Sequence, residues 1–218
     1  MKLSHLLIEG VYDPSIFKAI FIVGSPGAGK SWVIDNLGIN EFGLKLLDSD
    51  REFVHYLTKM NKSLKIDHNK DPELLQIRQR AVQLDNKFKS LYMAGRLGVV
   101  VSGTGYSFDI ISNKKKELED FGYDTYIIFV NTSMDIALQR NKSRDRTLGD
   151  DVVTSKWAMY MANIGKLQEL FGAERFFVFD NSDESNSLDN IKRLYKTVAR
   201  WVTSPLSYTA KTWISKNI

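Results

Sequence analysis

Gly24-Ser25-Pro26-Gly27-Ala28-Gly29-Lys30-Ser31 is the stretch that decides the fold of this chain. It matches the phosphate-binding pattern G-x-x-x-x-G-K-[ST] at every fixed position. The apolar residues 17–23 before it predict a buried strand, and residues 31–37 after it predict the start of a helix. A strand, a glycine loop and a helix in this order indicate a P-loop. The alternative is a glycine-rich turn between a strand and a helix that binds nothing.

Each part of this loop has an expected task in binding a triphosphate. Gly24, Gly27 and Gly29 allow the backbone to bend so that its N–H groups point inward, and the helix N-terminus adds partial positive charge. Lys30 is expected to reach the β- and γ-phosphates, and the Ser31 hydroxyl is expected to hold Mg²⁺. The whole stretch is therefore the predicted binding site for ATP and Mg²⁺.

Length and composition favour a single domain, residues 1–218. A chain of 218 residues with 43% hydrophobic residues can bury one full core, and its sequence shows no linker, repeat or low-complexity tract. It contains no cysteine, which excludes disulfides and thiolate metal sites and suits a cytoplasmic location. The three histidines lack metal-ligand spacing, and no apolar run approaches the ~20 residues that span a membrane. The net charge of +4 is a weak sign of an anionic partner, and nothing indicates an oligomeric state.

Strands and helices are predicted to alternate along the chain. Strands joined by helices must pair in parallel with right-handed connections, so the expected fold class is α/β. We expect a three-layer sandwich around a five-stranded parallel sheet, as in P-loop NTPases of the nucleotide-kinase type. Residues 98–101 form an unbroken apolar run and are expected at the centre of the sheet. The predicted strands are residues 17–23, 44–47, 98–101, 124–131 and 175–180, and further predicted helices include residues 71–95, 110–121 and 188–202.

Two carboxylates, Asp48 and Asp50, follow the predicted strand 44–47. In open α/β sheets, ligands bind at the carboxyl ends of the strands, which favours a functional role for this pair. The alternative is a helix N-cap, because Asp favours that position and a helical pattern begins at Arg51. The two roles are compatible, with one residue capping the helix while the other takes part in chemistry.

Arginines follow the fourth predicted strand, in the segment Ala137-Leu-Gln-Arg140-Asn-Lys-Ser-Arg144-Asp-Arg146. Arg140 and Arg144 lie one helical turn apart and therefore share one face. Guanidinium groups match phosphate oxygens and neutralise the charge that builds up in phosphoryl transfer. With a predicted helix that begins at Asp150, this segment is expected to form a helical lid over residues 140–171. The alternative is a basic surface patch that pairs with nearby acids.

The P-loop, Asp48-Ser-Asp50 and Leu138-Gln-Arg140-Asn-Lys-Ser-Arg144 resemble, in order and spacing, the kinase domain of bacteriophage polynucleotide kinases. The broader similarity, over residues 17–180, is to the zeta-toxin-like P-loop kinases that phages often encode. The resemblance implies that Asp50 is the general base toward the acceptor hydroxyl. It also implies that Arg144 clamps the transferring phosphate, with Arg140 or Arg146 as a supporting donor and Lys30 as the P-loop cation. A phage-encoded protein of this kind is expected in the cytoplasm of a host cell.

The sequence departs from this resemblance in three places. Polynucleotide kinases often have an aspartate within Ser-Asp-Thr after the third strand, whereas this chain has Ser102-Gly103-Thr104. Asp48 is therefore the expected substitute as the Mg²⁺ carboxylate. The residues before Phe17 and the tail of residues 203–218 have no counterpart in the polynucleotide kinase motifs.

Three functions follow as hypotheses. The first is an ATP-dependent kinase that phosphorylates a hydroxyl of a nucleic acid or nucleotide, and the second is the same chemistry on a nucleotide sugar. The third is a non-catalytic switch that reports ATP occupancy to a partner through the aromatic C-terminal tail. Asp50 favours a kinase over a switch, because a switch needs no base at an acceptor site. The aromatic residues in question are Trp201, Tyr208 and Trp213.

The basic residues of two predicted helices bear on the choice of acceptor. A polymeric acceptor needs an open basic channel with aromatic surfaces, whereas a small acceptor needs a walled pocket. If these residues line a channel, the acceptor is a nucleic acid or its nucleotide units; the alternative is that they are solvated helix faces. The candidates are Arg78, Arg80, Lys87, Lys89, Arg96 and Lys114-Lys-Lys116, with aromatic rings at Tyr92, Tyr106 and Phe108.

Overall fold

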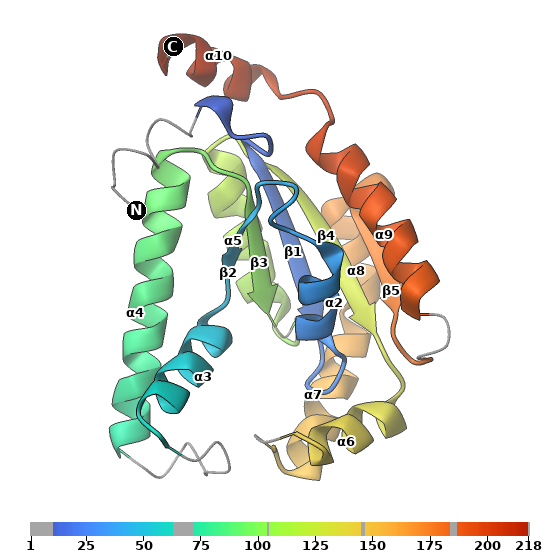
Figure 1. Ribbon diagram of the computed structural model, residues 1–218. Helices are drawn as coiled ribbons and strands as arrows, with labels where there is room; N and C mark the ends of the chain where they lie inside the picture. The colour runs from blue at the N-terminus through green and yellow to red at the C-terminus, as the bar shows by residue number, and fades with distance from the viewer. Residues whose placement is uncertain (1–10, 63–71, 104, 145–146, 184–186, 218) are drawn as a thin grey trace.

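A five-stranded parallel sheet with the strand order β2-β3-β1-β4-β5 runs through the molecule (Figure 1). The computed structural model describes residues 11–62, 72–103, 105–144, 147–183 and 187–217. Helices connect consecutive strands, and all neighbouring strands pair in parallel, which confirms the predicted α/β class. The strands are β1 Lys18–Gly24, β2 Lys45–Leu47, β3 Val99–Gly103, β4 Asp124–Asn131 and β5 Phe176–Asp180.

Strand β1, which leads into the P-loop, occupies the centre of the sheet and is buried along its whole length. Its Phe21 pairs with Val101 of β3 on one side and with Ile127 of β4 on the other. The prediction that residues 98–101 form the centre is therefore wrong, since β3 lies between β1 and the edge strand β2. An unbroken apolar run is typical of any strand covered on both faces, so it does not distinguish the middle strand from its neighbour.

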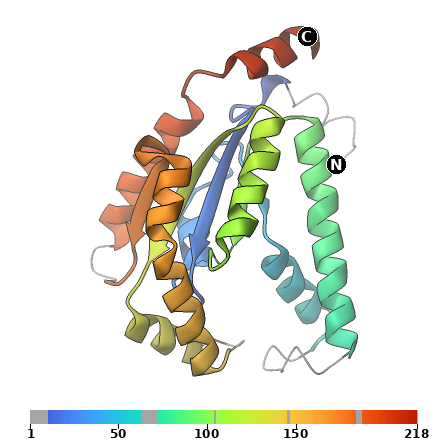
Figure 2. The same ribbon diagram turned by 180° about the vertical axis from the view of Figure 1, so that it is seen from behind.

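Helices cover both faces of the sheet, which confirms the predicted three-layer sandwich (Figures 1 and 2). One face carries α2 Lys30–Leu37 and α9 Ser187–Val202, and the other carries α5 Phe108–Asp120 and α8 Ile164–Phe171, with the 3₁₀ helix η1 Ala173–Arg175 before β5. The side chains of β1 point alternately to the two faces of the sheet. Ile20 and Ile22 belong to the core under α2 and α9, whereas Phe21 and Val23 belong to the core under α5 and α8.

Two further helices form a hairpin beside the sheet, α3 Ser49–Lys59 and α4 Pro72–Ala94. Figure 1 shows the hairpin at the side of the sheet that ends with β2. The hairpin has a small hydrophobic core of its own, separate from the two cores of the sheet. The buried residues of this core are Phe53, Leu57, Leu74, Ile77 and Ala81.

Beyond the carboxyl ends of the strands lie α6 Met134–Lys142 and α7 Asp150–Ala162 (Figure 1). Tyr160 near the end of α7 and Phe171 of α8 are buried in the core under α5 and α8. The second half of the segment expected to form a lid is therefore part of the hydrophobic core. The movement of residues 140–171 as a lid stays a prediction.

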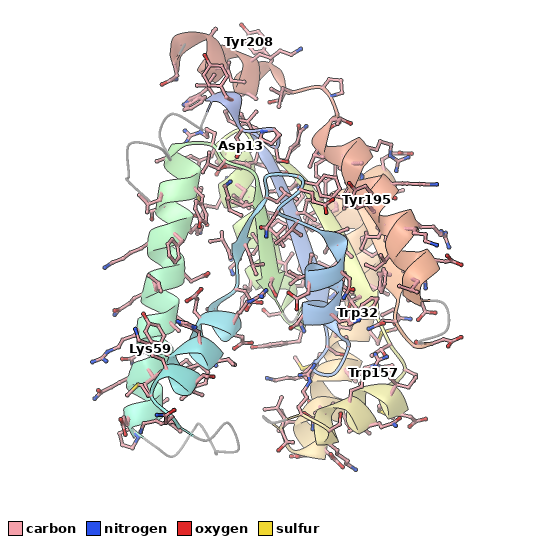
Figure 3. The ribbon with its side chains drawn as sticks, in the orientation of Figure 1. Asp13, Trp32, Lys59, Trp157, Tyr195 and Tyr208 are labelled. Atoms are coloured by element: carbon pink, nitrogen blue, oxygen red, sulfur yellow. The ribbon has the colours of Figure 1, made fainter. Side chains whose placement is uncertain are left out.

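The sequence did not predict the last helix, α10 Tyr208–Asn217. The Trp213 ring of this helix lies 5.5 Å from the ring of Phe17, just before β1, in an edge-on arrangement. Figure 3 shows Tyr208 of α10 and Trp157 of α7 at opposite ends of the molecule. The C-terminal tail thus packs at the amino ends of the strands, away from the P-loop.

A buried lysine fixes the segment between α9 and α10. Lys18 of β1 donates to Asp124 of β4 at 2.9 Å and to the Ser204 hydroxyl at 2.8 Å. A buried ammonium needs such partners, because an unpaired charge in the interior is strongly unfavourable.

In the part of the chain that the structure describes, no helix is both long and apolar enough to cross a membrane.

Candidate functional site

The P-loop follows β1 directly and runs into α2, as the sequence predicts. Gly27 has a φ of 84° and Gly29 a φ of 88°, both in the left-handed region that favours glycine. A Cβ atom on Gly27 would lie 2.2 Å from the carbonyl oxygen of Ala137 in α6. One on Gly29 would lie 2.2 Å from Nδ2 of Asn181, after β5. Backbone conformation therefore favours glycine at both positions, and at Gly27 the backbone of Ala137 also leaves no room for a side chain.

The ammonium group of Lys30 is held against the P-loop by two backbone carbonyls. It donates to the carbonyl oxygen of Gly24 at 2.8 Å and to that of Ser25 at 3.3 Å. Burial lowers the pKa of Lys30 to about 8, and the cation of Arg144 adds to this effect while the carboxylate of Asp48 opposes it. A phosphate group beside Lys30 would favour the charged ammonium, so this site is suited to a polyanion.

One cavity of about 620 Å³ brings together residues from the P-loop, the β2–α3 junction, the end of β3 and the segment after α6. The carboxyl ends of β1, β2 and β3 meet at this edge of the sheet, which is why residues distant in the sequence become neighbours. The residues of the predicted nucleotide and catalytic site that line the cavity are Pro26, Lys30, Ser31, Asp48, Asp50 and Arg144, and those of the predicted acceptor channel are Arg78, Tyr106 and Lys114.

The two carboxylates after β2 have different surroundings. Asp48 is the N-cap of α3, and its Oδ1 accepts from the backbone N–H groups of Asp50 at 3.0 Å and Arg51 at 3.1 Å. Asp50 lies in the first turn of α3, where its Oδ1 accepts from Nη1 of Arg78 at 3.2 Å. The N-cap interpretation thus holds for Asp48, while Asp50 presents its carboxylate at the cavity lining.

The two predicted lid arginines occupy different places. Arg144 lines the cavity, whereas Nη1 of Arg140 donates to the carbonyl oxygen of Asn181 at 2.9 Å. Nδ2 of Asn181 donates in turn to the carbonyl oxygen of Ala28 in the P-loop at 2.7 Å. Arg140 therefore braces the P-loop from the side of β5, and it is not among the described residues that line the cavity. Arg146 lies outside the residues that the structure describes.

A buried asparagine closes the base of the loop that carries Arg144. Nδ2 of Asn141 donates to the carbonyl oxygen of Leu148 at 2.8 Å, and its Oδ1 accepts from the N–H of Leu148 at 3.1 Å. Two bonds to one backbone unit fix the distance between the ends of the loop. Asn141 thus ties the end of α6 to Leu148, which lines the cavity as Arg144 does.

Residues 20–167 match the AAA domain family, and this stretch contains the P-loop, Asp50 and Arg144. The chain belongs to this family of P-loop NTPases. Family membership and the P-loop geometry together support ATP binding by this AAA domain. No curated protein matches the sequence.

Solved structures share the fold of this AAA domain at low sequence identity. A candidate kinase from Chloroflexus aurantiacus is 12% identical, with a TM-score of 0.57 over 84% of this chain and 97% of that chain. A chain of the PezAT chromosomal toxin–antitoxin system of Streptococcus pneumoniae is 16% identical, with a TM-score of 0.56. The match covers 99% of this chain and 93% of that chain. A chain of the AvrRxo1-ORF1:AvrRxo1-ORF2 complex is 12% identical, with a TM-score of 0.60. The match covers 83% of this chain and 62% of that chain. These likenesses show a P-loop kinase-like fold. The narrower resemblance to bacteriophage polynucleotide kinases and a phage origin stay predictions.

The residues predicted to hold Mg²⁺ in this AAA domain fit that ion. Ser31 and Asp48 line the same cavity and offer a hydroxyl oxygen and a carboxylate oxygen, the hard ligands that Mg²⁺ prefers. Both N–H bonds to Asp48 use Oδ1, and Oδ2 has no partner among the described residues. Mg²⁺ is usually bound by one or two protein oxygens together with substrate phosphates, so these two residues suffice.

Strand β3 ends at Gly103, where polynucleotide kinases often have an aspartate. Gly103 lines the cavity, and a Cβ atom added to it would meet no heavy atom within 4 Å. Space for a side chain therefore exists at this position of the AAA domain. With glycine there, Asp48 stays the proposed carboxylate for the metal.

Sequence reasoning missed Lys156 of α7, which lines the cavity. Its ammonium group lies 5.2 Å from the centre of the Tyr106 ring, and its charge helps to lower the pKa of Lys30. Lys156 stands one turn before Tyr160, but the burial of Tyr160 comes from tertiary packing, so no pattern in the sequence marks Lys156 as inward-facing. Tyr106, expected as a stacking surface for bases, lines the cavity and contacts this cation, and its stacking role stays a prediction.

Proposed function

We propose that this protein is an ATP-dependent kinase that transfers the γ-phosphate of ATP to a hydroxyl group of a small acceptor. The observation that carries the proposal is the cavity shared by Lys30, Asp50 and Arg144. A P-loop lysine, a carboxylate and a further cation around one space are the parts that phosphoryl transfer requires. The kinase-like fold of the AAA domain supports the same proposal.

The cavity residues have different proposed roles in the reaction. Asp50 orients the acceptor hydroxyl and takes its proton as the new O–P bond forms and the bond between the γ-phosphorus and ADP breaks. Lys30 holds the β- and γ-phosphates, while Arg144 and Lys156 balance the charge on the transferring phosphoryl group. When bound at Ser31 and Asp48, Mg²⁺ supplies further neutralisation of the phosphate charge.

The arrangement of basic residues favours a small acceptor over a nucleic acid. Three of the lysines grouped as a channel pair with acids on the protein surface: Lys89 with Glu117, Lys115 with Glu119 and Lys116 with Asp120. Arg96 lies over the rings of Phe121 and Trp213, at 4.8 Å and 5.3 Å, at the amino ends of the strands. Of the grouped basic residues that the structure describes, Arg78 and Lys114 line the cavity, which supports a localised acceptor site over a long channel. Nucleotides and nucleotide sugars remain among the small acceptors.

The switch hypothesis relies on the aromatic tail, in which Trp201 and Trp213 have packing roles while Tyr208 is exposed. Trp201 is buried and stacks on Tyr126 with ring centroids 4.9 Å apart. Trp213 packs against Phe17 at the end of the sheet opposite the P-loop. Neither ring is placed to report nucleotide occupancy directly, which supports the kinase over the switch.

Phosphate transfer tests the proposed function. The protein is incubated with γ-labelled ATP and Mg²⁺ in separate reactions with small alcohols, nucleotides, nucleotide sugars, DNA and RNA. We expect label on a small acceptor, loss of that label in Lys30→Ala and Asp50→Asn, and normal transfer in the control Lys59→Ala at the end of α3. Transfer to DNA or RNA alone would refute a small acceptor. ATP binding without transfer to any acceptor would refute the kinase.

A further inference from the structure

One wall of the cavity carries two cations that the proposed mechanism does not use, Arg78 and Lys114. Arg78 comes from α4 and Lys114 from α5, so they approach the cavity from different elements. Val54 of α3 and Ile110 of α5 add apolar surface to the same lining. We call these four residues and Asp50 the acceptor wall.

Arg78 is oriented by two contacts across the hairpin. Its guanidinium lies 5.6 Å from the centre of the Phe53 ring, and Nη1 lies 3.2 Å from Oδ1 of Asp50. The ion pair is half-exposed, with side-chain exposures of 44% for Arg78 and 54% for Asp50. An ion pair of this kind contributes little to stability, so an incoming anion can share the guanidinium at small cost. The planar fork of arginine is suited to bind a carboxylate or phosphate through two parallel bonds.

Lys114 differs from its two neighbours on α5. Lys115 and Lys116 each pair with a carboxylate one turn later, whereas Lys114 has no ion-pair partner in the described chain. It lies close enough to Asp85 of α4 to lower the pKa of that carboxyl group, although burial raises the same pKa by more. Lys114 is thus a cation at the cavity lining that forms no ion pair within the described chain, with Asp85 of α4 as a nearby carboxyl group.

We propose that the acceptor carries a phosphate or carboxylate group beside its hydroxyl, and that Arg78 and Lys114 bind this anionic group. This inference rests on the proposed kinase function. The contact between Arg78 and Asp50 places the anion-binding guanidinium next to the base, so a short hydroxylated anion spans both. The acceptor class is therefore a small hydroxy acid or phosphorylated alcohol, and Arg78 and Lys114 determine specificity for it.

Binding to the nucleotide-loaded protein tests this inference without requiring any reaction. The P-loop is first saturated with Mg²⁺ and a non-hydrolysable ATP analogue, so that added anions cannot occupy it. Glycerol 3-phosphate, glycerate and glycerol are then titrated into this complex by calorimetry. Glycerol 3-phosphate carries a phosphate group and glycerate a carboxylate group, whereas glycerol is uncharged. We expect one or both anions to bind at least about tenfold more tightly than glycerol.

Paired variants test whether the residues of the acceptor wall bind the anionic group. Arg78→Gln and Lys114→Gln should each weaken binding of the preferred anion by about tenfold or more, while binding of the ATP analogue stays unchanged. Arg80→Gln on α4 and Lys116→Gln on α5 are the matched controls, since neither residue is among those lining the cavity. These controls should bind like the wild-type protein, and thermal melting should show that all four variants are folded.

The outcomes separate this inference from the proposed function. Equal binding of glycerol and the anions, no anion binding at millimolar concentration, or anion binding that survives both wall substitutions would overturn the inference. Tighter binding of a DNA oligonucleotide than of either small anion would also overturn it. Failure of the proposed function has a different signature, namely wild-type anion binding in the absence of phosphate transfer to any acceptor.

Discussion

The hydroxyl group of Tyr160 lies 3.1 Å from the carbonyl oxygen of Val23, the residue just before the P-loop. The same hydroxyl lies 3.0 Å from the carbonyl oxygen of Val130 in β4, and the Tyr160 ring stacks on Phe129 with centroids 3.9 Å apart. Burial raises the pKa of Tyr160 well above its ordinary value, so the phenol keeps its proton and remains a donor. A residue of α7 thus supports the end of the strand that carries the P-loop.

Tyr160→Phe should lower the free energy of unfolding by about 1–2 kcal/mol, because it leaves buried carbonyl oxygens without their donor. Tyr195→Phe is a suitable control, since its hydroxyl donates to Glu41 at 3.3 Å on the surface and should matter by less than about 0.5 kcal/mol. Urea unfolding of both variants measures the difference. Equal stability of the two variants would mean that the Tyr160 hydroxyl does not support the strand.

Asp50→Asn should lower kcat by roughly 10²–10⁴ with nearly unchanged ATP affinity, because it removes the proposed base and not a phosphate ligand. Asp48→Asn should instead raise the Mg²⁺ concentration needed for activity. Asparagine is also a good N-cap, so this change leaves the start of α3 intact. Initial rates over a Mg²⁺ series compare the variants, and the same Mg²⁺ dependence in both would refute the separate roles.

Arg144→Lys should lower kcat by roughly 10² even though the net charge is unchanged, because an ammonium group cannot form the two parallel bonds of a guanidinium. Arg193→Lys on α9 serves as the control, since Arg193 is exposed and not among the residues lining the cavity. Steady-state rates with saturating ATP are the measurement. Full activity of Arg144→Lys would show that Arg144 does not bind the transferring phosphoryl group through two parallel bonds.

ATP affinity should fall as the pH rises above 8. Burial lowers the pKa of Lys30 to about 8 in the free protein, and bound phosphates favour the charged form and so raise this pKa. Below pH 8 the ammonium is already charged, whereas above it binding requires proton uptake and weakens by up to about tenfold per pH unit. Calorimetry at pH 6.5 and 9 in buffers of different ionisation enthalpy detects the proton uptake. Lys30→Ala should bind more weakly and lose this pH dependence; its retention would assign the effect to another group.

Gly103→Asp should fold normally and lower the Mg²⁺ concentration needed for half-maximal activity. Open space surrounds this position at the end of β3, and the new carboxylate would add an oxygen ligand at the cavity lining. Gly165→Asp on α8 has equally open surroundings but is not among the residues lining the cavity, so it controls for the added charge. If both variants keep the wild-type Mg²⁺ dependence, the metal does not bind near the end of β3.

Local patterns predicted much of this fold and of the cavity. The P-loop, the alternation of strands and helices, and the convergence of Asp50 and Arg144 all follow from the rule that parallel strands place their carboxyl ends at one edge. The middle strand was misassigned because apolar content reports burial and not position in the sheet. Arg140, expected as a supporting donor beside Arg144, contacts Asn181 in this structure, because helical spacing gives a shared face but not its direction. Its role as a donor stays a prediction. Lys156 was missed because its position depends on tertiary packing of α7.

The hairpin of α3 and α4 has a practical consequence for the evolution and engineering of this protein. It supplies Asp50, Val54 and Arg78 to the cavity, yet its core from Phe53 to Ala81 is separate from the two cores of the sheet. The hairpin therefore positions one side of the acceptor wall, while α5, which packs on the sheet, positions Lys114 and Ile110 on the other. A chimaera that takes residues 49–81 from a relative should therefore change acceptor preference only in part, because Lys114 and Ile110 of α5 stay in the acceptor wall. The end of α4 should be kept from the host, because Met93 is buried in the core under α5 and α8.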